Sequence, residues 1–253
     1  MDTDRTTADV VVIGGGVAGL SAAAFLARAD LDTLVLDAGG SILRRNAHLE
    51  NVPGFPAGID ARLFLDLLSE QADRAGCRRA EATVTRLTRT DDADRKPFAV
   101  ETTAGDRYSA RFVVAATKNT VDYLADLPGV ELLDQGKSFV ATDERGRTGV
   151  PGLYAAGRLA GKPHQAAVSA GHGAEVGVTL LEDDDSPFYH DWVAPEGYFT
   201  DRGRPVPPGC EEIDAAEREA RDAESRALLR ERLAEPHPAE QETHPSLVDE
   251  DGN

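Results

Sequence analysis

Three glycines near the start of the chain are spaced to bind a phosphate group. Gly14, Gly16 and Gly19 form the pattern G-x-G-x-x-G directly after the apolar run Ala8–Ile13. In this pattern the first glycine permits a tight turn, the second lets a pyrophosphate approach the backbone, and the third allows a helix to pack closely on a strand. Asp37 follows 18 residues after Gly19, where a carboxylate can accept a hydrogen bond from a ribose hydroxyl. The spacing favours a dinucleotide site, for NAD or FAD, and the alternative is a tight turn that binds no ligand.

The elements around these glycines must form a strand, a turn, a helix and a second strand. Residues 18–29 are rich in Ala and Leu and predict a helix, whose N-terminus would direct unpaired N–H groups at the phosphate. The apolar run Thr33–Leu36 predicts the next strand, reached by a right-handed crossover. Further patterns predict a helix over 61–75 and a helix over 166–181 with small residues on the face nearest the sheet. They also predict a three-stranded antiparallel meander from 82–90, 97–103 and 107–109. Single strands are predicted at 112–116, 139–142 and 153–156. The predicted fold class is α/β and Rossmann-like, with a parallel sheet and an antiparallel meander.

The charge of the chain divides it into two parts. The net charge is −18, of which residues 1–181, with 24 acidic and 20 basic side chains, hold −4, and residues 182–253, with 21 and 7, hold −14. We therefore expect a single domain over 8–181 and an acidic C-terminal extension over 182–253. The extension contains an aromatic segment, a predicted helix over 213–233 and a polar, frayed end over 235–253. The aromatic side chains are Phe188, Tyr189, Trp192, Tyr198 and Phe199.

Composition also excludes several classes of function. Phosphates and anionic membranes repel so acidic a surface, so neither a nucleic acid nor a membrane is expected as a partner. Only four of the 27 basic residues are Lys, and this acid-rich, Lys-poor composition is typical of proteins adapted to high salt. The polar N-terminus and the absence of a long apolar run predict a cytoplasmic protein. Cys77 and Cys210 form no C-x-x-C pair, and no metal site is expected.

A second motif favours FAD over NAD. The segment Thr148–Gly157, T-G-V-P-G-L-Y-A-A-G, resembles the second FAD fingerprint of the glutathione-reductase and thioredoxin-reductase superfamily. Three further segments make the resemblance narrower, to the low-molecular-weight thioredoxin reductases. They are Gly39-Gly40-Ser41 with Asn51-Val52-Pro53-Gly54-Phe55-Pro56, Ala115-Ala116-Thr117, and His164-Gln165-Ala166.

This resemblance implies a three-layer FAD/NAD(P)-binding domain with FAD as cofactor. It also implies a homodimer, because members of the family dimerise largely through this domain. Gln165 and the Ala166 N–H would bond the flavin ring, with Asn51 near it and the backbone around Val84 holding the adenine. A helix N-terminus at Gln165 would also stabilise reduced, anionic flavin. The residues expected to bind the cofactor are Gly14, Gly16, Val17, Ala18, Gly19, Asp37, Ala38, Asn51, Val84, Ala116, Thr117, Gly157, Arg158, Gln165 and Ala166.

Three departures from the family matter for function. Only 30 residues separate Thr117 from Thr148, too few for the NAD(P)H domain that the family inserts there, and there is no second G-x-G-x-x-G. The redox C-x-x-C is absent, so thioredoxin reduction is not expected, and Cys77 is interpreted as a packing residue. Arg158 replaces the fingerprint aspartate and Lys118 replaces the glycine of A-T-G. These two cations either contact an anionic cofactor or point to solvent.

The main hypothesis is an FAD-dependent oxidoreductase with a small-molecule or protein redox partner. The alternatives are a flavin-binding electron carrier or regulatory protein without turnover, and an NAD-binding module whose flavin site is lost. The aromatic segment around Trp192 either covers the open flavin face or packs as a stabilising strap. His172 and His190 are possible proton donors by position, although no sequence pattern supplies either with a partner.

Overall fold

The computed structural model describes residues 6–90, 97–184, 187, 190–244 and 247. The chain divides into two compact units, and each is described separately below. One unit comprises the chain up to Asp183 together with the segment from Gln241, and the other comprises Asp184–Glu240. Within the described ranges, none of the helices combines the length and apolar character needed to cross a membrane.

The first unit is built on a mixed sheet of seven strands. Its strands are β1 (Thr7–Ile13), β2 (Thr33–Asp37), β3 (Arg78–Glu81), β4 (Val84–Arg89), β5 (Phe98–Thr102), β6 (Arg107–Ala115) and β9 (Leu153–Ala155). They lie in the order β3-β2-β1-β6-β5-β4, and β9 also pairs with β6. The strands β3, β2, β1, β6 and β9 run parallel, whereas β4, β5 and β6 form an antiparallel meander. This arrangement confirms the predicted fold class.

Strand β6 joins the two kinds of sheet. The sequence predicted separate strands at 107–109 and 112–116, but the structure has one continuous strand. Its first half pairs antiparallel with β5 from Arg107 to Ala110, and its second half pairs parallel with β9 from Val113 to Ala115. One edge of β6 is taken by β1. Strands β5 and β9 therefore share the opposite edge of β6. The residues of β6 also become more buried toward its end, where the last three are all buried.

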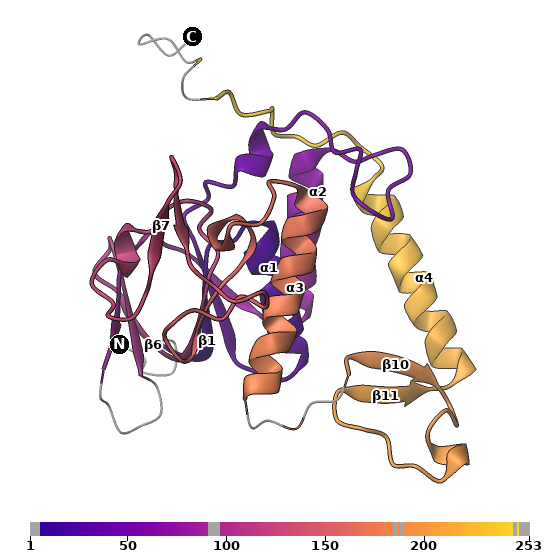
Figure 1. The fold of residues 1–253 in the computed structure, drawn as a ribbon. Helices are drawn as coiled ribbons and strands as arrows, with labels where there is room; N and C mark the ends of the chain where they lie inside the picture. The colour runs from indigo at the N-terminus through magenta and orange to yellow at the C-terminus, as the bar shows by residue number, and fades with distance from the viewer. Residues whose placement is uncertain (1–5, 91–96, 185–186, 188–189, 245–246, 248–253) are drawn as a thin grey trace. The chain divides into compact units, whose positions relative to one another are not determined.

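Three helices accompany this sheet and lie together to its right in Figure 1. They are α1 (Val17–Arg28), α2 (Ala61–Arg74) and α3 (Ala166–Asp183), and α1 packs against both of the others. The α2 helix begins at Asp60, whose carboxylate accepts hydrogen bonds from the N–H groups of Arg62 (2.8 Å) and Leu63 (3.0 Å). Such a cap satisfies donors that the first helical turn leaves unpaired.

The small residues of α3 face α1, which corrects the prediction that they face the sheet. A Cβ on Gly173 would overlap the Ala18 carbonyl oxygen, and one on Gly177 would lie 3.1 Å from the Ala22 carbonyl oxygen. The two backbones therefore approach closely because glycine has no side chain. A small-residue stripe does not reveal from sequence whether its neighbour is a helix or a sheet.

The remaining elements of this unit are short. They are the 3-10 turns η1 (Ile42–Arg45), η2 (Asp122–Leu124) and η3 (Gly157–Ala160), and the hairpin β7 (Leu132–Asp134) and β8 (Ser138–Val140). Strand β8 is shorter and earlier than the predicted strand 139–142. Strand β3 follows Cys77 and was not predicted. The Cys77 thiol is buried and donates to the Ala23 carbonyl (3.2 Å), which agrees with its interpretation as a packing residue.

The second unit contains a two-stranded parallel sheet, a 3-10 turn and one helix. These are β10 (Trp192–Pro195), η4 (Thr200–Arg202), β11 (Cys210–Ile213) and α4 (Ala215–Arg232). The Glu212 carboxylate organises the turn, because it accepts hydrogen bonds from the backbone N–H groups of Gly197, Phe199 and Thr200. On α4, Glu217 and Arg221 form an ion pair one helical turn apart (2.7 Å). The Asp214 carboxylate caps the helix by accepting a hydrogen bond from the Glu217 N–H (2.8 Å).

The aromatic segment forms a cluster inside the second unit. The ring centroids of Trp192 and Tyr198 lie 4.6 Å apart, and those of Tyr198 and Phe199 lie 5.0 Å apart, both with edge-to-face geometry. Arg202 stacks 3.9 Å from the centroid of the Tyr198 ring. Phe188 and Tyr189, which the sequence grouped with these rings, lie outside the described residues.

Candidate functional site

The glycine loop connects the end of β1 to the start of α1. Gly14 has a left-handed φ of +108°, and a Cβ there would lie 2.7 Å from the Ala116 carbonyl oxygen. A Cβ on Gly19 would overlap the Gly14 carbonyl oxygen, so this glycine lets the helix close on the turn. Gly16 differs from both, because the nearest atom to its Cβ position is the Ser41 Oγ at 4.0 Å. The space beside Gly16 is open, as a bound phosphate requires.

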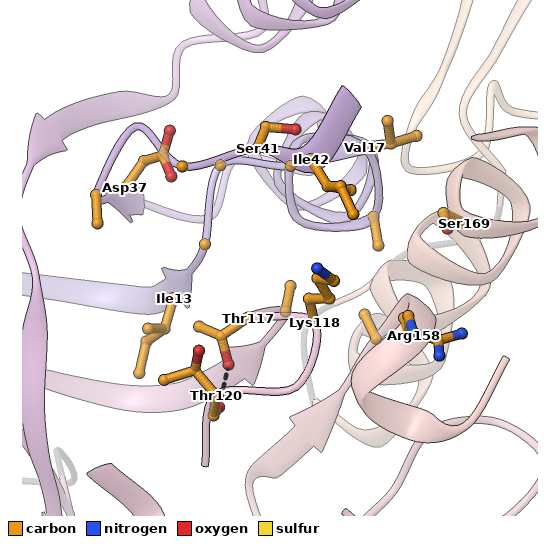
Figure 2. Close-up of a pocket in the computed structure, with 18 of the residues that line it drawn as sticks. Ile13, Val17, Asp37, Ser41, Ile42, Thr117, Lys118, Thr120, Arg158 and Ser169 are labelled. Carbon is orange, nitrogen blue, oxygen red and sulfur yellow. Dashed lines mark hydrogen bonds between the residues drawn. The ribbon is translucent and has the colours of Figure 1, made fainter. Parts of the chain in front are cut away.

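A pocket of about 420 Å³ extends from this loop. Figure 2 shows Asp37 at one side of it, at the end of β2, and Lys118 and Arg158 at the other. The loop itself approaches Asp37 closely, since a Cβ on Gly15 would lie 2.7 Å from the carboxylate Oδ2. Asp37 thus occupies the position expected of a ribose-binding carboxylate beside a phosphate loop.

Most of the residues predicted to bind the cofactor line this one pocket, although they come from distant parts of the sequence. Those that line it are Gly14, Gly16, Val17, Ala18, Asp37, Ala38, Val84, Ala116, Thr117, Arg158, Gln165 and Ala166. Gly19, Asn51 and Gly157 are not among the lining residues. Gly19 acts in packing, while Asn51 donates from Nδ2 to the Oε1 of Gln165 (2.8 Å) and so holds a lining side chain.

Gly157 supports the pocket from behind, together with a buried histidine. It has a left-handed φ of +64°, and a Cβ there would lie 2.6 Å from the Ala18 Cβ. Its N–H donates to the Nδ1 of His172 (2.9 Å), and His172 is only 5% exposed. Burial, with a further contribution from Lys162, lowers the pKa of His172. A neutral His172 that accepts this bond positions the turn before Arg158, and it does not line the pocket.

Several lining residues gave no sequence signal. Tyr123 in η2 is buried, and its hydroxyl shares a hydrogen bond with the Thr117 hydroxyl (2.9 Å). The Thr117 hydroxyl in turn donates to the Thr120 carbonyl oxygen (2.6 Å; Figure 2). Burial raises the pKa of Tyr123 well above its usual range, so the phenol stays neutral. These contacts fix the loop after β6, which carries Thr117 and Lys118.

Lys118 and Arg158, the two cations that replace family residues, both line the pocket. Lys118 has a left-handed φ of +63°, a conformation that favours glycine, and it occupies the position of the glycine in A-T-G. Burial, together with Arg45, Lys137 and Arg158, lowers the pKa of Lys118. The Arg158 Nε donates to the Asn119 Oδ1 (3.3 Å), and its guanidinium lies 5.7 Å from the centroid of the Phe139 ring. Both side chains are half-buried, which disfavours the interpretation that they simply point to solvent.

The end of the pocket near Gln165 meets the N-terminus of α3, which begins at Ala166. Unpaired N–H groups at a helix N-terminus carry a partial positive charge that favours an anion. His164 lines the pocket beside them, and burial with the charges of Arg158, Lys118 and Lys137 lowers its pKa. A phosphate loop and ribose carboxylate at one end and a helix N-terminus at the other are the features of a dinucleotide-binding flavoprotein domain.

Comparison with known proteins agrees with this class. Residues 9–47 match the protein family described as FAD dependent oxidoreductase. The chain is 40% identical over 146 residues to the bifunctional thioredoxin reductase/thioredoxin of Mycobacterium leprae, and the matched region covers 54% of this chain and 30% of the relative. It is 32% identical over 143 residues to the thioredoxin reductase of Listeria monocytogenes, and this match covers 56% of this chain and 43% of the relative. The chain thus spans less than half the length of these curated relatives.

Solved structures share the fold. A thioredoxin reductase from Gloeobacter violaceus has a TM-score of 0.65 at 17% identity, over 75% of this chain and 100% of that one. The thioredoxin reductase of Streptococcus pyogenes has a TM-score of 0.62 at 14% identity, over 70% and 98%. Together the comparisons confirm the predicted resemblance to thioredoxin reductases and the predicted fold, and they agree with FAD as the predicted cofactor.

Proposed function

We propose that this chain binds FAD in the pocket between Gly16 and Gln165 and acts as an FAD-dependent oxidoreductase. The observation that carries the proposal is the open space beside Gly16, in a loop whose other glycines are closely packed. Packing alone explains why Gly14 and Gly19 are glycines. Packing does not explain Gly16, where a side chain would fit unless a phosphate occupies the space. The residues present therefore fit a dinucleotide with a pyrophosphate at the loop.

Each part of the pocket would hold a different part of the cofactor. The Gly14–Val17 backbone and the α1 N-terminus would bind the pyrophosphate, and Asp37 would accept from the adenosine ribose. Gln165, held by Asn51, and the Ala166 N–H would contact the flavin ring. When bound, FAD supplies hydride or electron transfer, while the protein supplies position and electrostatics.

We further propose that this chain holds the flavin without a nicotinamide domain of the kind the family inserts after A-T-G. In support, residues 118–147 form only η2 and the β7–β8 hairpin. Electrons would then come from a substrate or a separate redox protein. The absence of a C-x-x-C supports a reaction other than thioredoxin reduction. A homodimer, a high-salt habitat and a cytoplasmic location complete the proposal.

The test begins with the absorbance spectrum of the purified protein after incubation with FAD and removal of free cofactor. Flavin absorbance bound in a one-to-one ratio is the expected result. A colourless protein that cannot be reconstituted, but binds NAD in calorimetry, would favour the module whose flavin site is lost. The yellow protein is then mixed anaerobically with NADH and with NADPH. We expect no rapid bleaching, and rapid bleaching by either would contradict the proposed lack of a nicotinamide site.

A further inference from the structure

The chain returns to the first unit near its C-terminal end. The segment from Gln241 belongs to that unit, although the preceding residues, Asp184–Glu240, form the second. Two hydrogen bonds attach it to η1. The Gln241 Nε2 donates to the Arg45 carbonyl oxygen (2.9 Å), and the Glu242 N–H donates to the Arg44 carbonyl oxygen (3.1 Å). The first bond joins residues 196 positions apart, so only the tertiary structure brings this returning segment, Gln241 and Glu242, to η1.

The returning segment binds the end of η1 where carbonyl groups lack partners within the turn. Inside η1, the N–H groups of Arg44 and Asn46 donate to the carbonyls of Ser41 and Leu43. The carbonyls of Arg44 and Arg45 come last in the turn, and the last carbonyls of a helical turn need acceptor partners from outside it. The returning segment supplies a donor to each of the two. The C-terminal end of η1 is therefore completed by a distant part of the chain.

The same turn is a wall of the cofactor pocket. Ser41, Ile42 and Leu43 all line the pocket, and Figure 2 shows Ser41 and Ile42 on the same side of it as Val17. The Ser41 Oγ is the nearest atom to the Cβ position of Gly16, at 4.0 Å. The start of η1 therefore bounds the open space in which a pyrophosphate would fit. A displacement of η1 would widen or narrow that space.

The connection from β2 to η1 is not held by packing. Gly39 and Gly40 lie there, and Gly39 has a left-handed φ of +77°. A Cβ on either glycine would meet no atom within 4 Å outside its chain neighbours, so the backbone has room to rotate at this point. The buried Leu43 side chain and a long hydrogen bond from the Arg62 Nη1 to the Asn46 carbonyl (3.4 Å) also hold η1. The returning segment adds two shorter bonds at the end remote from the glycines.

We propose that Gln241 and Glu242 are positioning residues that hold η1 in place as one wall of the cofactor pocket. The inference rests on the proposed FAD site, and it makes retention of the cofactor depend on a segment outside that site. Neither residue lines the pocket, so the returning segment leaves room for FAD. Without its two bonds, η1 would move away from the pyrophosphate more often. Bound FAD would then leave the pocket faster.

The matched variants Glu242→Pro and Glu242→Ala test the backbone bond. Proline has no N–H to donate to the Arg44 carbonyl, whereas alanine keeps the N–H and removes the same exposed side chain. Each full-length variant is loaded with FAD, and the bound cofactor is measured by absorbance after dilution and timed removal of free FAD. We expect Glu242→Pro to release FAD roughly two- to tenfold faster than Glu242→Ala, the factor expected for one neutral hydrogen bond. Glu242→Ala should release FAD at the rate of the unmodified protein.

Gln241→Ala tests the side-chain bond independently and should speed the release of FAD by a similar factor. Urea unfolding of the apoproteins separates positioning from global stability. Because both residues are exposed and lie near the end of the chain, the free energy of unfolding should not change in any of the three variants. The proposal is overturned if Glu242→Pro and Glu242→Ala release FAD at equal rates, or if Gln241→Ala releases it no faster than the unmodified protein. Faster release that is matched by a loss of apoprotein stability also overturns it.

Hydrogen–deuterium exchange of the apoprotein separates this inference from the proposed function. The amides of Arg44 and Asn46 donate the internal bonds of η1, so their exchange reports whether the turn is held, with no flavin needed. If FAD fails to load into the unmodified protein, the proposed function fails. Faster exchange at these amides in Glu242→Pro than in Glu242→Ala then supports the positioning role by itself, and equal exchange overturns it.

Discussion

Replacing Gly16 with Ala should weaken the binding of FAD without weakening the fold. Gly16 precedes α1 with φ −82° and ψ −176°, an extended conformation that alanine adopts freely. Restricting the unfolded chain stabilises such a variant by about 0.4–1 kcal/mol, and the poorer helix cap offsets this by a similar amount. The free energy of unfolding of the apoprotein should therefore change by less than about 0.5 kcal/mol.

The expected loss of affinity for FAD is much larger. The added methyl occupies the open space beside Gly16, where a pyrophosphate oxygen would approach the backbone. Losing one hydrogen bond to a charged group costs about 1.5–3 kcal/mol, which corresponds to roughly 10- to 150-fold in the dissociation constant. FAD titration followed by calorimetry measures this loss, and urea unfolding followed by circular dichroism measures the stability of the apoprotein.

Gly19→Ala is the comparison variant from the same loop. Its Cβ would overlap the Gly14 carbonyl oxygen, so the strand end and the helix must separate. Overpacking of this kind costs about 1–3 kcal/mol, so the apoprotein itself should be less stable. The reasoning is refuted if Gly16→Ala binds FAD as tightly as the unmodified protein, or if Gly16→Ala destabilises the apoprotein as much as Gly19→Ala does.

Three further predictions concern stability and reactivity. Lys118→Gly should raise the free energy of unfolding by about 0.5–1 kcal/mol in urea denaturation, because glycine relieves the left-handed backbone; a loss of stability would contradict this. Burial lowers the pKa of His172, so the unfolded chain takes up its proton first as the pH falls. The free energy of unfolding should be fully retained above about pH 6.5 and fall below it, and His172→Gln should flatten that decline. Burial raises the pKa of the Cys77 thiol to about 11, so at pH 8 iodoacetamide should alkylate the partly exposed Cys210 first; equal rates, measured by mass spectrometry, would show that Cys77 is accessible.

The sequence predicted the elements whose determinants are local. The strand Thr7–Ile13, the helix Val17–Arg28 and the strand Thr33–Asp37 follow from an apolar run, a glycine turn and a second apolar run, all within about 30 residues. The Gln165–Ala166 turn was also predicted correctly as the start of a helix. In each case short-range geometry decides the structure, so one stretch of sequence contains the information.

What the sequence missed depends on distant partners. Strand β6 was divided because polar side chains at Ser109 and Arg111 interrupt its apolar pattern, although its pairing partners on both sides keep it continuous. Strand β3 carries two arginines and a glutamate, so only its pairing with β2 identifies it. The convergence of Lys118 with Arg45 and Lys137 likewise requires three segments to meet. No pattern along one segment can predict such a meeting.

The pairing of β6 with β9 has a consequence for the order of events during synthesis of the protein. The pocket draws its walls from Ile13 through to Ser169, and the late segment joins the sheet only when β9 pairs with β6. A ribosome-bound chain that ends before β9 would expose the glycine loop but lack the turn of Arg158 and the N-terminus of α3. Capture of the whole flavin should therefore require synthesis of the chain through Ser169, well after the glycine loop has left the ribosome.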